Sequence, residues 1–325
     1  MPDGATVDIT PARRVPVGPD WDGARLDRFL AAHLPGLPPG AIQRLVRTGQ
    51  VRVNGGRVRS GQRLTTGMEV RLPPVRPAST TEEKRPTPPP QRVAELARRI
   101  LYRDRHLLIL DKPAGWAVHG GSGQPWGLID AVRLLPAEAG AEPELCHRLD
   151  KDTSGCLVFG LDKPTVRRLA EMFRNGAVHK RYLALVAGHP RPRQGAIRQP
   201  LVKGVTRGGE RMVVAREGGQ AACTRYRVLS RHGTASLVEA RPETGRTHQI
   251  RVHCQWAGHP LAGDAKYGDR TFNERLARLG LKRLFLHAAG LEFVHPATGQ
   301  PLAVTAPLDP TLDLLLHRLR EETDP

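Results

Sequence analysis

The 325-residue sequence is poor in cysteine, aromatic residues and lysine. Its four cysteines, Cys146, Cys156, Cys223 and Cys254, form no Cys-x-x-Cys pair, so neither a disulfide framework nor a paired-thiol metal site is indicated. The first residues lack the basic and then apolar profile of a signal peptide, and no apolar run approaches the ~18 residues needed to cross a membrane. These absences predict a cytoplasmic protein with reduced thiols and no membrane contact.

Positive charge, in contrast, is in excess. Lys and Arg number 50 against 32 Asp and Glu, which gives a net charge of +18. Only 8 of the 50 cations are Lys and the other 42 are Arg, whose planar guanidinium binds phosphate through two hydrogen bonds and stacks on bases. A GC-rich genome also produces an Arg-rich composition, but a basic globular chain favours a polyanionic partner such as RNA or DNA.

The length and the hydrophobic pattern predict two domains, each long enough to bury a core. Leu26 to Leu34 and Ala41 to Thr48 have helical spacing, and an alternating strand then leads into an Asn54-Gly55 turn. A stretch rich in Pro, Thr, Ser and charge follows, which is typical of a linker. We therefore expect a flexible leader over 1–15, a helix-helix-hairpin module over 16–75, a Pro-rich linker over 76–98 and a second domain over 99–325.

The second domain contains short apolar strands and helices in irregular order. Strands are predicted over 107–110, 156–159, 182–186, 235–240 and 291–294. Helices are predicted over 128–135, 165–175, 247–255 and 272–279. Because strands follow one another without regular βαβ alternation, we expect an α+β domain with a mixed, largely antiparallel central sheet.

Arginines crowd the second helix and the hairpin of the first module. They include Arg44, Arg47 and Arg52. A solvated basic face is one explanation for them. The segments 25–30, 42–47 and 49–55, however, resemble the S4 RNA-binding module. This resemblance implies that the cations contact the phosphate backbone of a structured RNA, which positions the protein but reads little sequence.

A polar run stands directly before a buried-looking strand of the second domain. Its sequence is Cys146-His147-Arg148-Leu149-Asp150-Lys151-Asp152-Thr153-Ser154-Gly155. A loop at the start of a core strand is either a structural turn or a site held by a rigid scaffold. A zinc site built from its His and Asp residues is disfavoured, because Arg148 and Lys151 alternate with these ligands and would repel a cation.

Four segments in a fixed order resemble the motifs of the RluA family of pseudouridine synthases. They are His-Arg-Leu-Asp at 147–150 with Thr-Ser-Gly at 153–155, and the segments 180–186, 245–253 and 284–288. The resemblance implies an enzyme that breaks the N1–C1′ bond of a uridine in RNA, turns the uracil and rejoins it through C5. It implies no cofactor and no metal, in agreement with the absence of a Gly-x-x-x-x-Gly-Lys-[Ser/Thr] loop or a strand-borne Gly-x-Gly-x-x-Gly.

The resemblance also implies catalytic residues. The reaction needs a carboxylate near C1′, as a nucleophile or as a stabiliser of positive charge on the sugar, and Asp150 is implied for this position with both roles open. Arg251 is implied to pair with Asp150, since an adjacent guanidinium favours the ionised carboxylate. Thr247 and His248 are expected to be structural, with Thr247 as the cap of the following helix.

The target uridine must leave the RNA stack before C1′ can be reached. Arg148 is implied to fill the gap that the base leaves. Tyr182 is implied to stack on the flipped uracil and to help remove the C5 proton. His147 is expected to orient the site, and Leu286 is expected to pack against the uracil.

The RNA substrate is less specifically indicated than the reaction. The segments 118–123, 267–269 and 284–288 resemble a member of the family that acts on large-subunit (23S) ribosomal RNA, and this resemblance implies the same substrate here. We expect a monomer. A second type of ribosomal enzyme in the family, a tRNA-acting member, and a non-catalytic S4-type protein of ribosome assembly are the alternatives. An esterase with its oxyanion loop at His119-Gly120-Gly121 is disfavoured, because no Gly-x-Ser-x-Gly elbow occurs.

Overall fold

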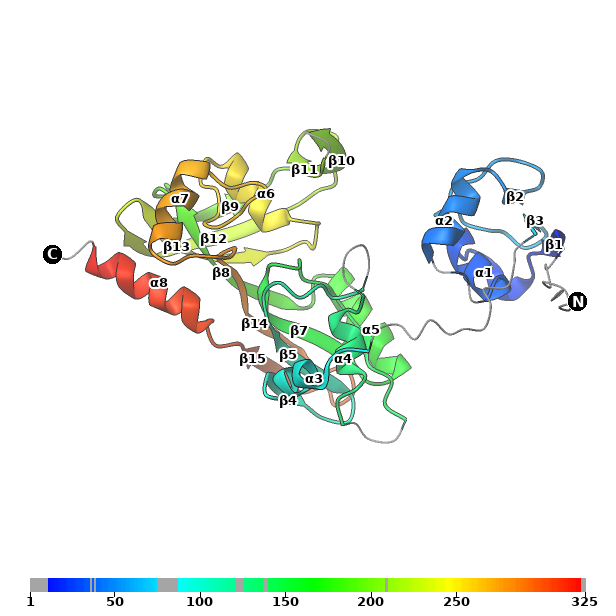
Figure 1. The fold of residues 1–325 in the computed structure, drawn as a ribbon, viewed down its shortest axis with the longest axis horizontal. Coiled ribbons are helices and arrows are strands. Elements are labelled where there is room, and N and C mark those ends of the chain that lie inside the picture. The colour runs from blue at the N-terminus through cyan, green and yellow to red at the C-terminus, as the bar shows by residue number, and fades with distance from the viewer. Residues whose placement is uncertain are drawn as a thin grey trace, which may run out of the picture. The chain divides into compact units, whose positions relative to one another are not determined.

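The chain divides into two compact units, Met1–Arg85 and Pro86–Pro325. The computed structural model describes residues 11–35, 37, 39–74, 87–120, 125–136, 140–207 and 210–322 (Figure 1). Most of the expected leader, residues 1–10, and a large part of the expected linker, residues 76–86, lie outside the described residues. The division between the two units falls inside the expected linker.

The N-terminal unit combines two helices with a small antiparallel sheet. Its elements are β1 (Arg13–Pro16), the 3-10 helix η1 (Pro19–Trp21), α1 (Leu26–His33), α2 (Pro39–Arg47), β2 (Arg52–Val53) and β3 (Glu69–Leu72). The strand order is β1-β3-β2. Asn54 and Gly55 have positive φ angles of 49° and 78°, so the predicted Asn-Gly turn is confirmed.

The core of this unit follows from helical spacing. Leu26, Phe29 and Leu30 are fully buried on α1 and belong to one cluster with Ile42 and Val46 of α2. Apolar residues three and four positions apart share one face of a helix, and burying that face holds the two helices on the sheet. The helix-helix-hairpin pattern is therefore confirmed.

The expected leader is too long at its C-terminal end. Arg13–Pro16 pair with Glu69–Leu72 in antiparallel register. This edge strand carries little periodic apolar signal, because three of its four residues are exposed. Its place in the sheet depends on hydrogen bonds to β3, which a pattern of apolar residues does not reveal.

The second unit contains the remaining elements. In chain order they are α3 (Pro90–Ala97), β4 (Ile100–Arg103), β5 (Leu107–Lys112), α4 (Leu128–Val132), β6 (Glu144–Leu145), β7 (Ser154–Gly160), α5 (Lys163–Arg174), β8 (His179–Ala187), β9 (Gln194–Ile197), β10 (Leu201–Arg207), β11 (Glu210–Ala215), β12 (Thr224–His232), β13 (Ala235–Pro242), α6 (Gln249–Trp256), α7 (Arg270–Arg278), β14 (Leu286–Val294), β15 (Pro301–Thr305) and α8 (Pro310–Glu321). No helix among the described residues has both the length and the apolar character of a membrane span.

One large sheet organises this unit. Its strand order is β4-β5-β7-β14-β8-β13-β12-β9, with β15 on β14 and β6 on β7, and β10 and β11 form a separate ribbon. The pairing of β14 with β7 is parallel, and the other pairings of this sheet are antiparallel. The expected mixed, largely antiparallel α+β sheet is confirmed.

Helices cover both faces of the sheet. Near β5 and β7, α4 packs on one face and α5 on the other. Near β8 and β13, α6 packs on one face, and α7 and α8 on the other. β14 lies between these two halves of the sheet and brings its first residues close to both.

The expected linker is too long, because residues 90–97 form α3. Leu96 of α3 is fully buried in the cluster of β5, β7 and α4, so this helix is part of the domain core. The helix was not predicted because its segment is rich in Pro and charged residues and has only one apolar stripe. The predicted helix over 128–135 is shorter than expected, since α4 ends at Val132.

Candidate active site

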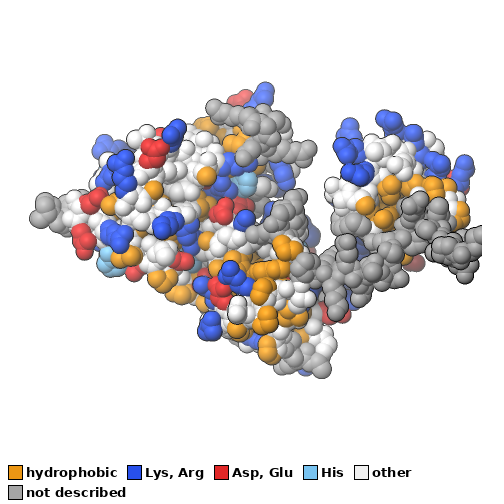
Figure 2. Space-filling view, in the orientation of Figure 1, with side chains coloured by type: hydrophobic (Ala, Val, Ile, Leu, Met, Phe, Trp, Pro, Cys, Tyr) orange, Lys and Arg blue, Asp and Glu red, His pale blue; other side chains and the backbone are white. Residues whose placement is uncertain are grey.

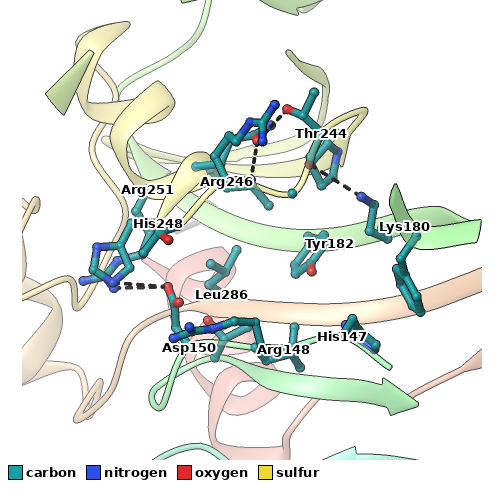
Figure 3. A pocket seen from close by; sticks show the side chains of 18 of the residues that line it. His147, Arg148, Asp150, Lys180, Tyr182, Thr244, Arg246, His248, Arg251 and Leu286 are labelled. Carbon is teal, nitrogen blue, oxygen red and sulfur yellow. Dashed lines mark hydrogen bonds and ion pairs between the residues drawn. The ribbon is translucent and has the colours of Figure 1, made fainter. Parts of the chain in front are cut away.

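A cavity of about 340 Å³ opens in the second unit where three segments meet (Figure 3). These are the loop before β7, the first half of β8, and the turn that leads into α6. The predicted residues that line it are His147, Arg148, Asp150, Tyr182, Arg251 and Leu286. The structure thus brings together six residues that the sequence separates by up to 139 positions, whereas Arg44, Arg47 and Arg52 lie in the other unit.

The loop that carries Asp150 is held from behind by Lys112, at the end of β5. The Lys112 side chain is fully buried, and its Nζ donates to the carbonyl of Lys151 at 2.8 Å and to that of Pro113 at 2.9 Å. Gly115, with φ of 81°, adds a backbone hydrogen bond of 2.9 Å to the same Lys151 carbonyl. Burial lowers the pKa of Lys112 to about 7, partly opposed by the charges of Asp152 and Asp150. The carbonyl next to Asp150 is therefore fixed by two donors.

The start of β7 fixes the other end of this loop. Gly155 has φ of 103°, and a Cβ there would lie 2.2 Å from the carbonyl oxygen of Ala288, so only glycine permits the close approach of β7 to β14. Ser154 Oγ lies 2.8 Å from His287 Nδ1 and accepts from Arg283 at 2.6 Å. These buried contacts make the loop a rigid platform for Asp150.

Arg251 is the partner of Asp150, as expected. Arg251 Nη1 lies 3.3 Å from Asp150 Oδ2 (Figure 3). The rest of the guanidinium is bound by Asp264, which accepts from Nε at 2.7 Å and from Nη2 at 2.8 Å. The Tyr267 ring lies beneath it, with its centre 5.0 Å from Arg251 Cζ. One nitrogen of a fixed guanidinium is thus directed at the candidate catalytic carboxylate.

Asp264 is a site residue that the sequence motifs did not single out. Its side chain is fully buried, and it also accepts from the backbone N–H groups of Lys266 and Tyr267 at 2.9 and 3.0 Å. Burial opposes its charge, but these hydrogen bonds and Arg251 lower its pKa below the usual value. The signal available in the sequence was an acidic residue directly after a glycine. In the structure Gly263 has a φ of 70° and forms a tight turn against the Arg283 carbonyl.

The helix cap differs from the prediction. His248, not Thr247, is the N-cap residue of α6, and its backbone is left-handed with φ of 53°. The turn is stabilised instead by the Gln249 side chain, whose Oε1 accepts from Thr244 Oγ1 at 2.6 Å and from the Arg246 N–H at 3.0 Å. The prediction that Thr247 caps the helix is wrong, because the longer side chain of Gln249, two residues later, already holds this segment.

This left-handed turn places His248 beside Asp150. His248 Nε2 lies 3.9 Å from Asp150 Oδ2, and His248 Nδ1 lies 2.8 Å from Tyr267 Oη. Because Tyr267 Oη accepts from the Val213 N–H, its own proton is free to be donated to His248 Nδ1, which favours a proton on Nε2 facing Asp150. Burial lowers the pKa of His248, so a neutral ring is favoured near pH 7.

Tyr182 and Leu286 form the apolar wall opposite Asp150. Leu286 begins β14 and is paired with Ala184 of β8, two residues after Tyr182 on the same face of that strand. Burial, followed by the charge of Asp150, raises the pKa of the Tyr182 phenol. In Figure 3 the Tyr182 ring lies across the cavity from Asp150, with Leu286 between them. The cavity is thus bounded by an apolar wall on one side and by the carboxylate on the other.

His147 is a structural member of the wall. Its ring stacks on Phe173 at 4.3 Å between centres, and its Nε2 accepts from the Val158 N–H at 3.1 Å. Burial lowers its pKa to about 3, so the ring is neutral. A neutral ring fixed at both its face and its edge is suited to the orienting role predicted for His147.

Several cations of the cavity, Lys180 and Arg148 among them, remain available to an anion. Lys180 shares a strand face with Tyr182, and its one hydrogen bond among the described residues is a long one of 3.5 Å to the Thr244 carbonyl. Burial lowers its pKa. Arg148 is exposed and forms no ion pair within the described part of the chain. No group of three metal-ligating side chains occurs among the described residues.

Comparison with known proteins agrees with this geometry. A family model for RNA pseudouridylate synthase matches residues 106–256, and a model of the S4 domain matches residues 24–70. The chain is 47% identical over 310 residues to ribosomal large subunit pseudouridine synthase C of Salmonella typhi, covering 95% of this chain and 97% of that protein. It is 47% identical over 308 residues to the protein of that name from Escherichia coli K12, covering 94% and 96% of the two chains.

A solved structure supports the fold. Human RNA pseudouridylate synthase domain containing 4 superposes with a TM-score of 0.60 at 32% identity, covering 71% of this chain and 96% of that chain. The sequence relatives and this solved structure are all named as pseudouridine or pseudouridylate synthases. The six residues that the resemblance singled out line one cavity. The chain therefore belongs to the family of RNA pseudouridine synthases and carries an S4 domain before its catalytic domain.

Proposed function

We propose that this enzyme converts uridines of large-subunit (23S) ribosomal RNA to pseudouridine. The names of its relatives, ribosomal large subunit pseudouridine synthase C, support this substrate over a tRNA and over the second ribosomal type. A non-catalytic role is disfavoured because Asp150, Tyr182 and Arg251 are all present in one cavity. Ribosomal RNA as substrate implies work in the cytoplasm, and we expect the enzyme to be a monomer.

The observation that carries this proposal is the fixed pairing of Asp150 with Arg251. The Arg251 guanidinium holds the carboxylate at the edge of the cavity, where it can act on C1′ of a flipped nucleotide as the N1–C1′ bond breaks. Tyr182 stacks on the uracil, and its protonated phenol relays the proton that leaves C5 after the C5–C1′ bond forms, accepting that proton as it passes its own to water. Arg148, exposed beside Asp150, fills the space that the base leaves in the RNA.

The S4 unit supplies affinity rather than chemistry. Arg44, Arg47 and Arg52 lie on α2 and β2, and Arg44 and Arg47 are exposed. Figure 2 shows Lys and Arg side chains on the visible face of this unit. Each phosphate neutralised by such a cation adds to the salt dependence of binding, so removal of residues 1–75 should reduce the slope of log K against log salt.

The test uses large-subunit ribosomal RNA made with C5-tritiated uridine. The wild-type enzyme should release tritium at one or a few positions without added nucleotide. Asp150→Asn keeps the shape but removes the charge, so kcat should fall by about 10³-fold or more while RNA binding is retained. Asp152→Asn, an exposed residue of the same loop outside the cavity lining, is the matched control and should remain within a few fold of wild type. Full activity of Asp150→Asn would refute the assignment.

A further inference from the structure

A second groove lies on the other side of α6 from the active cavity. It has a volume of about 370 Å³ and is formed by the end of β8, the segment 190–199, β12, β13 and the last turn of α6. Its floor is apolar, with Val186, Ile197, Val238 and Ala240. None of these residues lines the active cavity, and none takes part in the reaction proposed above.

The same elements connect the two cavities. Arg251 lines the active cavity and Trp256 lines the groove; five helical residues separate them by about 7–8 Å along the axis and by about 140° around it. On β8, Tyr182 lines the first and Val186 the second, about 13 Å apart along the strand. A few nucleotides of extended RNA can span either of these separations.

Aromatic rings form the walls of the groove. Trp256 is 56% exposed, which is unusual for so large an apolar side chain, and it stands at the C-terminal end of α6. Tyr226 is half-buried, donates from its Oη to the Pro192 carbonyl at 3.1 Å and rests on Gly195. His259 Nδ1 lies 2.8 Å from the Ala187 carbonyl and therefore donates to it, which fixes the ring. Tyr226 and His259 thus offer flat faces that are held in place before a ligand binds, and Trp256 adds an exposed one.

The charge of the groove is positive. Arg191 and Arg198 are exposed, and neither forms an ion pair among the described residues. No Asp or Glu occurs in the described lining. A ligand with a flat apolar face and an adjacent negative charge is complementary to this surface, since phosphate pairs with guanidinium and bases stack on aromatic rings.

We propose that this groove binds an unpaired base of the same RNA whose target uridine enters the active cavity. The base stacks on Trp256, and Arg191 and Arg198 pair with its flanking phosphates. This inference rests on the proposed function, because it takes RNA as the substrate. Stacking between a base and an aromatic ring tolerates any base, so the groove adds affinity and fixes the register of the strand without reading its sequence.

The experiment measures the fluorescence of Trp256 and the affinity for RNA in the full chain. Trp256→Phe removes the reporter but keeps an aromatic face, whereas Trp256→Ala removes both. Leu314→Ala, on the exposed face of α8 and outside both cavities, is the matched control. The probes are a short oligoadenylate, inorganic polyphosphate of matched charge, and large-subunit ribosomal RNA bound in an Asp150→Asn background.

Oligoadenylate should quench wild-type fluorescence more than that of Trp256→Phe, which retains the tryptophans Trp21, Trp116 and Trp126. Trp256→Ala should weaken binding of the ribosomal RNA by about 5- to 150-fold, and Trp256→Phe should restore most of it. Equal quenching in wild type and Trp256→Phe, or equal affinity of Trp256→Ala and Leu314→Ala, would overturn the inference. Equal quenching by polyphosphate and oligoadenylate would also overturn it, because polyphosphate has no base.

The two proposals fail in different ways. Absence of tritium release from ribosomal RNA by the wild-type enzyme contradicts the proposed function, whatever the fluorescence shows. Normal tritium release together with unchanged affinity of Trp256→Ala contradicts the groove alone.

Discussion

Replacing Asp264 by asparagine tests whether Arg251 depends on a buried charge. Asp264 is fully buried and accepts two hydrogen bonds from Arg251 and two from backbone N–H groups. Asparagine has the same shape, but it removes the negative charge and turns an N–H₂ group toward a guanidinium. Leaving one partner of a buried ion pair uncompensated costs about 3–5 kcal/mol. For a unit the size of Pro86–Pro325, this lowers the melting temperature by roughly 6–20 °C.

The assay is thermal unfolding followed by circular dichroism, with Glu274→Gln as control. Glu274 pairs with Arg270 on α7, where the two side chains are 55% and 92% exposed, so its loss should cost less than about 1 kcal/mol. If Asp264→Asn melts within the range of Glu274→Gln, the buried pair does not stabilise the site and the reasoning is refuted.

The pH dependence gives a second readout for Asp264. Its folded pKa is lowered, so its stabilisation is fully present above the unfolded value of about 3.9 and is lost as pH falls through the folded value. The wild-type melting temperature should therefore fall on acidification below about pH 4, and its difference from Asp264→Asn should shrink there. A difference that is constant from neutral to strongly acidic pH would contradict this account.

Two further predictions concern packing and thiols. Gly155→Ala should destabilise the catalytic unit severely, because its Cβ would meet the Ala288 carbonyl, whereas Gly176→Ala, with a φ of 75° but its nearest neighbour 3.8 Å away, should cost about 1 kcal/mol in urea unfolding. Burial raises the pKa of three thiols to about 12, and these belong to Cys146, Cys156 and Cys254. Iodoacetamide at about pH 8 should therefore alkylate the half-buried Cys223 first in the folded protein, as mass spectrometry can check, and labelling of the other three at the same rate would contradict their burial.

Local patterns were sufficient for the elements that have strong periodicity. The α1 and α2 pair, the Asn54-Gly55 turn and the strands β5, β7 and β8 all agree with predictions made from apolar spacing, because burial of one face dictates that spacing. The elements that the sequence did not predict have weaker patterns. β1 is mostly exposed, and α3 has a single apolar stripe among prolines and charges.

The site residues also divide into those that the sequence predicted and those that only the structure shows. Asp150, Tyr182 and Arg251 were singled out because each lies in a motif that resembles the family's own. Asp264 lies in no such motif, although it binds Arg251 more closely than Asp150 does, at 2.7 Å against 3.3 Å. The position of His248 depends on a left-handed backbone angle that few side chains adopt, and no composition or spacing announces it. Contacts between residues on either side of a turn cannot be predicted from the sequence alone.

The helix α6 explains why the two cavities act on one substrate. It has eight residues, too few for a stable isolated helix, so its position depends on tertiary contacts. Gln249 binds the Cys223 carbonyl and Thr224 Oγ1 at its start, and His253, fully buried, contacts Thr224 Oγ1 at 2.8 Å and the Gln199 carbonyl at 2.9 Å. These contacts fix the whole helix to β12 as one body. A base stacked on Trp256 at one end is thereby held at a set distance from the carboxylate that Arg251 fixes at the other, so binding energy from a remote nucleotide orients the reacting one.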